Sequence, residues 1–123
     1  MAYLNDDVLD DGIQEITDDG NVLHICSQEP ATYTEASSTY TLGNKTSLSV
    51  AAPADRTAGG RSVTVSAITD GTVSGTGTAS HEAIVDSVGT RLLATDALSS
   101  SQSVTSGNTF TLTSFTVGIP DPA

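Results

Sequence analysis

Alternation of small apolar residues with serine and threonine is the feature that most limits how this chain can fold. Within residues 46–119, segments such as SVTVSAI and NTFTLTSFTVGI place an apolar residue at nearly every second position. Side chains at alternate positions of a β-strand point to opposite faces, so the pattern gives one buried row and one row of hydroxyl groups in water. The chain is therefore predicted to be mainly β, an antiparallel β-sandwich.

Turn-forming residues divide this region into strands. The segment 53–60 is expected to be a loop, and Asp70-Gly71 and the segment 87–89 are typical of hairpin turns. Each of these two turns is expected to join the strands that flank it. The predicted strands are 46–51, 61–69, 72–86, 90–95 and 109–119, with 99–106 as a serine-rich connector.

Two irregularities are predicted within the strands. Gly75 and Gly77 indicate a bend or the close approach of another part of the backbone. The apolar positions also change parity between Phe110 and Phe115. A bulge near Ser114 is expected to turn both apolar sets toward one core.

A short helix is expected before the sheet. Residues 5–17 place Leu9, Ile13 and Ile16 on one helical face, and the aspartates at the start of this segment can cap it. Gly12 inside the helix costs about 1 kcal/mol relative to alanine.

A short strand and a second helix are expected next. Residues 22–27 are predicted to form an apolar strand. Thr32 and Glu35 then have the spacing of a capping box, which favours a short helix that ends by Gly43. Residues 39–42 also fit a strand, so both assignments stay open here.

Length and charge indicate one domain with two unlike parts. The chain has 123 residues and a formal net charge of −11, and its first 44 residues contain nine acids and neither lysine nor arginine. We expect a single domain, 1–123, with an acidic segment (1–44), an antiparallel sheet region (45–119) and a tail (120–123). An acidic segment repels nucleic acid and anionic lipid, and it suits either solubility or docking on a basic protein surface.

No pattern for catalysis, a cofactor or a metal is found. His24 and His81 lie in apolar surroundings, without a G-x-S-x-G elbow or a Walker loop elsewhere in the chain. An EF-hand loop with Gly12 or Gly20 at its sixth position puts Leu9 or Cys26 at a ligand position, so neither register works. A nonstandard surface Ca²⁺ site stays open, but the expectation is a protein without enzymatic activity, cofactor or metal.

The remaining charged and sulfur-containing residues have structural interpretations. Arg61 and Arg91 are expected to pair across strands with Glu82, Asp86 or Asp96, or to anchor an interface. The single cysteine lies in the run NVLHIC and is predicted to be a buried small hydrophobe. No signal peptide or membrane span is indicated, so folding in the cytoplasm is expected.

Three stretches of the chain resemble a recurrent group of small structural proteins of tailed-bacteriophage virions. They are HICSQEPATYTEASSTYTLGNKTSLSV, TGTASHEAIVDSVGTRLLATDAL and SVTSGNTFTLTSFTVGIPDP, which together cover most of the sequence. The resemblance implies a structural role in the virion, assembled in the host cytoplasm, and supplies no catalytic or binding residues.

The leading expectation is a capsid decoration (cement) protein. It would bind the major capsid protein or other virion proteins as a homo-oligomer, with a trimer favoured, and would bind neither nucleic acid nor membrane. The alternative is a tail, neck or fibre component. A glycan-binding adsorption module is a further alternative, disfavoured because only five aromatic side chains exist to stack on sugars.

Overall fold

The computed structural model describes residues 6–120, with side chains from residue 10 onward, and shows a mainly β protein with one N-terminal α-helix. All its strand pairs are antiparallel, which confirms the predicted fold class. The elements are α1 (Asp6–Asp19), β1 (Val22–Cys26), η1 (Glu35–Thr39), β2 (Thr41–Thr46), β3 (Ala54–Asp55), β4 (Arg61–Val65), β5 (Ile68–Val73), β6 (Gly77–Asp86), β7 (Arg91–Val104), β8 (Thr109–Leu112) and β9 (Phe115–Ile119).

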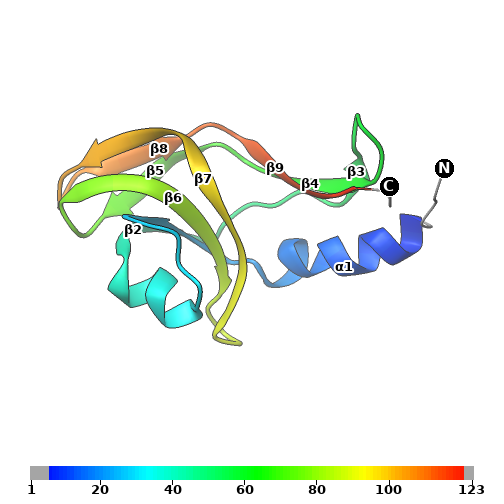
Figure 1. Cartoon of the computed structure of the whole chain (residues 1–123), viewed down its shortest axis with the longest axis horizontal. Helices are drawn as coiled ribbons and strands as arrows, with labels where there is room; N and C mark the ends of the chain where they lie inside the picture. The colour runs from blue at the N-terminus through cyan, green and yellow to red at the C-terminus, as the bar shows by residue number, and fades with distance from the viewer. Residues whose placement is uncertain (1–5, 121–123) are drawn as a thin grey trace.

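The strands form two sheets of different size. The larger sheet has the order β7-β6-β1-β2-β5-β8, and the smaller has the order β3-β4-β9. Figure 1 shows the larger sheet curled at one end of the molecule, while the smaller sheet lies along α1 at the other end. The helix packs mainly on β4, with further contacts to β9 and β6. The molecule is therefore elongated, with a curled-sheet lobe and a helix lobe.

One bent ribbon of two strands connects the lobes. In the helix lobe β4 pairs with β9, from Arg61↔Ile119 to Val65↔Phe115. In the curled sheet β5 pairs with β8, beginning at Ile68↔Leu112. The residue pairs keep the same register on both sides of the break. Each of the two chain segments leaves the smaller sheet, is not paired with the other for two residues (66–67 and 113–114), and then enters the larger sheet.

This break replaces the bulge predicted near Ser114. The change of parity is real, but an interruption of pairing on both strands accommodates it rather than an extra residue on one. The register slips by one residue farther along, between Ile68 and Gly71. Gly71 faces the ring of Phe110 there, and a Cβ atom at this position would collide with the ring. The glycine therefore makes room for the aromatic side chain.

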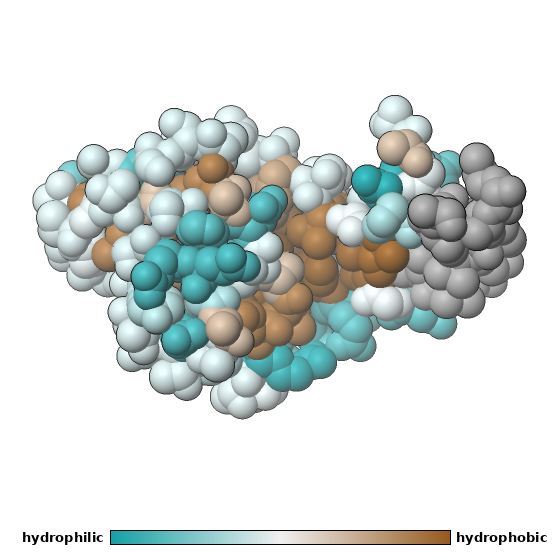
Figure 2. Space-filling view, in the orientation of Figure 1, coloured by the Kyte–Doolittle hydropathy of each residue, from teal (hydrophilic) through white to brown (hydrophobic). Residues whose placement is uncertain are grey.

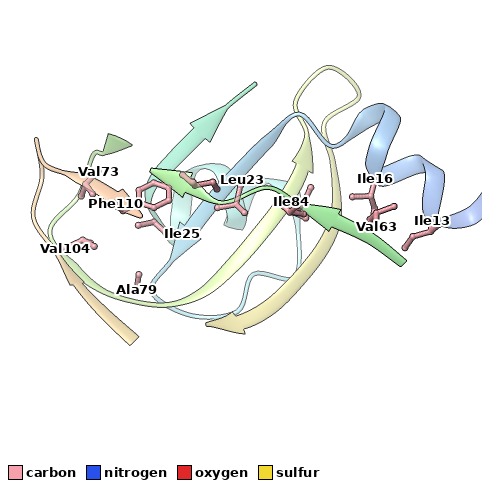
Figure 3. Packing of buried hydrophobic residues seen from close by; sticks show 12 residues of the cluster. Ile13, Ile16, Leu23, Ile25, Val63, Val73, Ala79, Ile84, Val104 and Phe110 are labelled. Carbon is pink, nitrogen blue, oxygen red and sulfur yellow. The ribbon is translucent and has the colours of Figure 1, made fainter. Parts of the chain in front are cut away.

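The main core fills the space inside the curled sheet and continues under α1. Figure 3 shows Leu23, Ile25 and Ile84 at its centre, with Ile13 and Ile16 of the helix at one end. Burial of Ile13 and Ile16 confirms the helical face predicted from their spacing; the side chain of Leu9 lies outside the described residues. The hydrophobic effect of this burial, roughly 25 cal/mol per Å² of apolar surface, holds the helix on the sheet.

A second, smaller cluster covers the opposite face of β1. It contains Val22, Cys26, Ala36, Ala83 and Val85, with Tyr33, Tyr40 and Leu92 packed against it. Because an apolar cluster covers each face of β1, all five of its residues are buried. A strand buried on both faces favours apolar residues at consecutive positions, and four of these five are apolar.

The second predicted helix is present only as a short turn. Thr32 Oγ1 accepts a 3.1 Å hydrogen bond from the Glu35 N–H, and the Glu35 carboxylate accepts one of 2.8 Å from the Ala31 N–H. Thr32 thus acts as predicted, whereas Glu35 binds the N–H of Ala31 instead of that of Thr32. The turn widens to a π-helical geometry, with Tyr40 N–H donating to the Glu35 carbonyl at 2.8 Å. The chain then enters β2 at Thr41, close to the strand alternative for 39–42. Gly43 lies inside that strand and does not end a helix.

Several predicted strand boundaries are wrong. The segment 46–51 is not a continuous strand, because β2 ends at Thr46 and Ser47 adopts a left-handed φ of 53°. Only Val50 in its second half forms an antiparallel bridge, with Val65. The segment 72–86 divides after Val73, and Asp70 and Gly71 lie within β5 instead of forming a turn. The predicted pairing of 61–69 with 72–86 is therefore wrong. The bend expected at Gly75 and Gly77 corresponds to the break between β5 and β6.

The β6–β7 hairpin is confirmed, but β7 is longer than predicted. It extends through the serine-rich segment to Val104, where that residue pairs with Gly77. β7 lies at the edge of the sheet, so its serine hydroxyl groups remain in water and do not oppose strand formation. Within the loop 53–60 only the two-residue strand β3 is formed.

Candidate functional site

The curled sheet has an open seam between its two edge strands, β7 and β8. These strands end the strand order, and within residues 6–120 the one hydrogen bond that joins them is 3.2 Å long, from Gln102 Nε2 to the Thr111 carbonyl. A hollow of about 500 Å³ opens at this seam. Its wall consists of Glu82, Asp96, Ala97, Leu98, Ser99, Ser100, Gln102, Thr111, Leu112, Thr113, Ser114 and Phe115.

Two carboxylates face each other on this wall. Glu82 of β6 and Asp96 of β7 are paired across the antiparallel ladder, so their side chains lie on the same face of the sheet. Glu82 is only 7% exposed, and no donor among the described residues hydrogen-bonds to its carboxylate. Asp96 is exposed and accepts a 2.8 Å hydrogen bond from the Ala97 N–H.

The surroundings of Glu82 favour its protonated form. Burial, together with the smaller effect of the nearby negative charge of Asp96, raises the pKa of Glu82 to about 7. A positively charged side chain in the hollow would favour the ionised form of Glu82, because it would supply the missing opposite charge. The hollow is thus suited to receive a positively charged group.

The alternation of the sequence misplaced Glu82. Strict alternation along 72–86 puts this residue on the solvent face, whereas the ladder of β6 and β7 shifts register on both sides of it. The shift between Ala79 and His81 changes which alternate positions face the main core, so that Glu82 and Ile84 point inward as Ala79 does. The hairpin predicted about 87–89 ends its second strand at residue 95, so it contains Glu82 but not Asp96; the longer β7 of the structure pairs the two.

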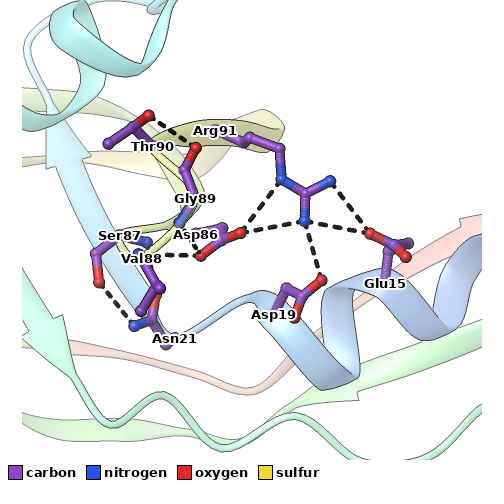
Figure 4. Close-up of polar contacts among 9 residues, drawn as sticks. All are labelled: Glu15, Asp19, Asn21, Asp86, Ser87, Val88, Gly89, Thr90 and Arg91. Atoms are coloured by element: carbon purple, nitrogen blue, oxygen red, sulfur yellow. Dashed lines mark hydrogen bonds and ion pairs between the residues drawn. The ribbon is translucent and has the colours of Figure 1, made fainter.

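Arg91 holds α1 against the β6–β7 hairpin. Its guanidinium donates to Glu15 at 3.2 Å and to Asp19 at 2.9 Å on the helix, and to Asp86 at 3.1 Å on β6 (Figure 4). The Gly89 N–H donates to Asp86 at 2.9 Å and, with Arg91, lowers the pKa of that carboxyl group. The carboxylates in turn raise the pKa of Arg91. The predicted pairing of Arg91 with Asp86 is confirmed.

Arg61 connects the helix to the smaller sheet. It donates to Asp10 of α1 at 2.7 Å and to Asp55 of β3 at 2.7 Å, and neither is among the three acids predicted for it. Among the described side chains, Asp10, Glu15 and Asp19 of α1 therefore attach the helix to the rest of the chain.

The other two bases also bind within the molecule. Lys45 forms an ion pair with Asp70 at 3.1 Å, and Arg56 donates to the Gly59 carbonyl at 2.7 Å. All four lysine and arginine residues of the chain thus have partners inside it.

Replacing Arg91 with methionine is expected to loosen α1. Methionine retains much of the apolar stem but removes the charge that joins the two helical acids to Asp86. We expect a melting temperature a few degrees lower and faster amide exchange along α1. The difference from the wild type should shrink in about 1 M NaCl, where the Debye length is about 3 Å.

Lys45→Met is the matched control for this experiment. It also removes one charge from an ion pair, but Asp70 is largely exposed and does not contact the helix. Amide exchange along α1 should stay unchanged in the control. Equal acceleration in both variants would show that Arg91 does not hold the helix.

The two histidines and the cysteine are located as predicted. His24 is buried, with Nδ1 3.0 Å from Thr41 Oγ1, and burial lowers its pKa. His81 Nδ1 lies 2.9 Å from Ser80 Oγ. Cys26 is buried, and desolvation raises the pKa of its thiol to about 11. A thiol with such a pKa stays protonated at neutral pH and is a poor nucleophile.

Among the described residues no group of three or more His, Cys, Asp or Glu side chains is arranged to hold a metal ion. Within residues 6–120 no helix has both the length and the apolar character needed to cross a membrane.

Comparison with protein-family models, with curated proteins and with solved structures finds no match.

Proposed function

We propose that this chain is a non-enzymatic structural protein of a bacteriophage virion, a decoration protein that binds the major capsid protein on the outer face of the head. The observation that carries the proposal is the open seam of the curled sheet. It presents unpaired strand edges around a hollow that is partly apolar and partly acidic. Edges of this kind are typical sites for binding an extended segment of another protein.

The surface beside the seam supports a role in protein–protein contact. Figure 2 shows apolar side chains gathered between the curled-sheet lobe and the helix lobe. Half-buried apolar residues that border the core include Leu93, Leu98, Phe115, Val117 and Ile119. Apolar surface between polar surroundings is typical of contact sites.

Overall charge agrees with a basic partner surface. The net charge is −11, and the four bases already have partners inside the molecule. Such a protein approaches a positively charged surface at an increased rate. The resemblance of the sequence to small virion proteins points to the same class of function.

Sugar binding has less support from the described aromatic side chains. Tyr33 and Tyr40 pack on the smaller apolar cluster, and Phe110 is buried in the main core. Aromatic rings that stack on sugars need an open face, so these three rings are poorly placed for that role.

Quantitative mass spectrometry of purified virions tests the proposed function. A decoration protein is expected in a copy number comparable to that of the major capsid protein, with density at regular positions on the capsid lattice. The isolated protein is expected to form a trimer in light-scattering measurements. A small set of copies confined to the tail or neck would select the tail alternative, and absence from the virion would reject both.

A further inference from the structure

We propose that the hollow at the seam is a socket for a basic side chain, an arginine or lysine carried on an extended segment of a partner protein. This inference rests on the proposed function, because it names the chemistry by which that function would be carried out. It follows from the charges, the wall and the strand edges of the hollow, and from the location of the chain's own bases.

The charges in the hollow lack an opposite charge. Glu82 is 7% exposed, has no hydrogen-bond donor among the described residues, and faces Asp96 across the ladder. The carboxylate oxygens of Glu82 are open to the hollow, because no fully buried side-chain oxygen among the described residues lacks a hydrogen-bond partner. A largely buried carboxylate without a counter-charge still favours taking up a proton or acquiring an opposite charge. A guanidinium or ammonium group in the hollow would provide that counter-charge with hydrogen bonds.

The wall of the hollow suits a side chain with an apolar stem and a charged tip. Leu98, Leu112 and Phe115 line the same space as the two carboxylates. Lysine and arginine bury their methylene groups on apolar surface while the charged end finds polar partners. A bare Ca²⁺ ion fits less well, because it needs six to eight oxygen ligands close around it, whereas this hollow measures about 500 Å³.

The strand edges beside the hollow suit an extended backbone. β7 and β8 each pair with a neighbour on one side only, and the Gln102 side chain makes the described hydrogen bond across the seam. An extended segment lying in the seam would pair with one of these edges and place alternate side chains into the hollow.

The bases of this chain are already engaged, which favours a base from a different protein. Lys45, Arg61 and Arg91 form ion pairs with acids of this chain, and Arg56 donates to the Gly59 carbonyl and packs beside Gly118. A second copy of this chain therefore offers no base that could enter the hollow without first leaving its own partner.

Peptide binding to the purified protein tests the socket. The probe is the acetylated and amidated peptide Ser-Val-Arg-Val-Ser, and the control peptide carries citrulline, the neutral isostere of arginine, at its centre. Titrations followed by ¹H–¹⁵N NMR should show shifts at Glu82, Asp96 and Thr111. Hydrogen bonds to charged groups contribute about 1.5–3 kcal/mol, so the arginine peptide should bind roughly tenfold or more tightly than the citrulline peptide.

Two variants locate the effect. Glu82→Gln should remove the preference for arginine. Glu29→Gln makes the same change at an exposed acid that binds Thr95, on the opposite face of β7, and should leave the preference intact. The wild-type comparison of the two peptides stands whether or not either variant folds.

Three results would overturn the socket. They are equal binding of the two peptides, an equal loss of preference in both variants, and shifts at the seam with CaCl₂ but none with the arginine peptide. None of these results bears on the presence of the protein in virions, so failure of the socket and failure of the proposed function are distinguishable.

Discussion

Leu23→Ala is expected to lower the free energy of unfolding by about 3–4 kcal/mol, the largest effect among the substitutions considered. Leu23 is fully buried in β1, which has a neighbouring strand on each side and apolar clusters on both faces. Truncation removes its transfer free energy and leaves a cavity that a strand held on both edges cannot close. Urea denaturation followed by circular dichroism measures the change.

Val88→Ala is the matched control for the core substitution. Val88 lies in the turn between β6 and β7 and is 88% exposed, so its truncation should change the free energy of unfolding by less than about 0.5 kcal/mol. A loss below about 1 kcal/mol for Leu23→Ala would mean that β1 does not form the centre of the fold.

Glu82→Gln is expected to stabilise the protein above neutral pH and to have little effect near pH 4. The pKa of Glu82 is raised from 4.5 to about 7 in the folded state. Between these values the unfolded chain has lost a proton that the folded chain keeps, so the stability contributed by this group falls as pH rises from 4.5 to 7. The glutamine variant lacks this loss, and at pH 8 it should exceed the wild type by at most about 3 kcal/mol.

The difference between wild type and variant isolates Glu82 from other titrating groups. His24 has the opposite effect, because burial lowers its pKa and stability from this residue is lost as pH falls through the range below 6.5. It is present in both proteins and cancels. Asp96, the charged group that faces Glu82 from β7, is also present in both. Parallel stability curves from pH 4 to pH 8 would show that folding does not raise the pKa of Glu82.

Local patterns in the sequence predicted the elements whose contacts are close in the chain. The spacing of Ile13 and Ile16 predicted α1, the apolar run after residue 21 predicted β1, and the turn at 87–89 predicted the β6–β7 hairpin. In each case the short sequence pattern lies within the element whose structure it determines. Helix periodicity and turn chemistry act over a few residues, so they can be recognised without the rest of the fold.

The assignments that failed depend on contacts between distant residues. Asp70-Gly71 has a hairpin sequence, but β5 continues through it because β8, about forty residues later, pairs alongside. The serine-rich segment after residue 98 becomes part of β7 because β6 provides a long ladder. Strand pairing of this kind overrides local propensity.

The candidate site was only partly predictable. Glu82 belongs to a predicted hairpin whose second strand ends one residue before Asp96, and alternation placed Glu82 on the polar face. Burial of this residue results from the register shifts in β6–β7 and from β8 and the segment that follows it, which wall the hollow. The acids of α1 illustrate the same point, since Asp10, Glu15 and Asp19 serve internal ion pairs that no spacing rule indicates.

The bent ribbon has a mechanical consequence. Each of its two chain segments, 61–73 and 109–119, passes from one lobe into the other. A force that separates the lobes therefore acts along the covalent backbone of both segments at once. The ladder is interrupted at 66–67 and 113–114, and the second of these segments forms part of the wall of the hollow. A segment bound in the hollow would lie against this joint and limit changes in the angle between the lobes, so binding there would stiffen the whole molecule.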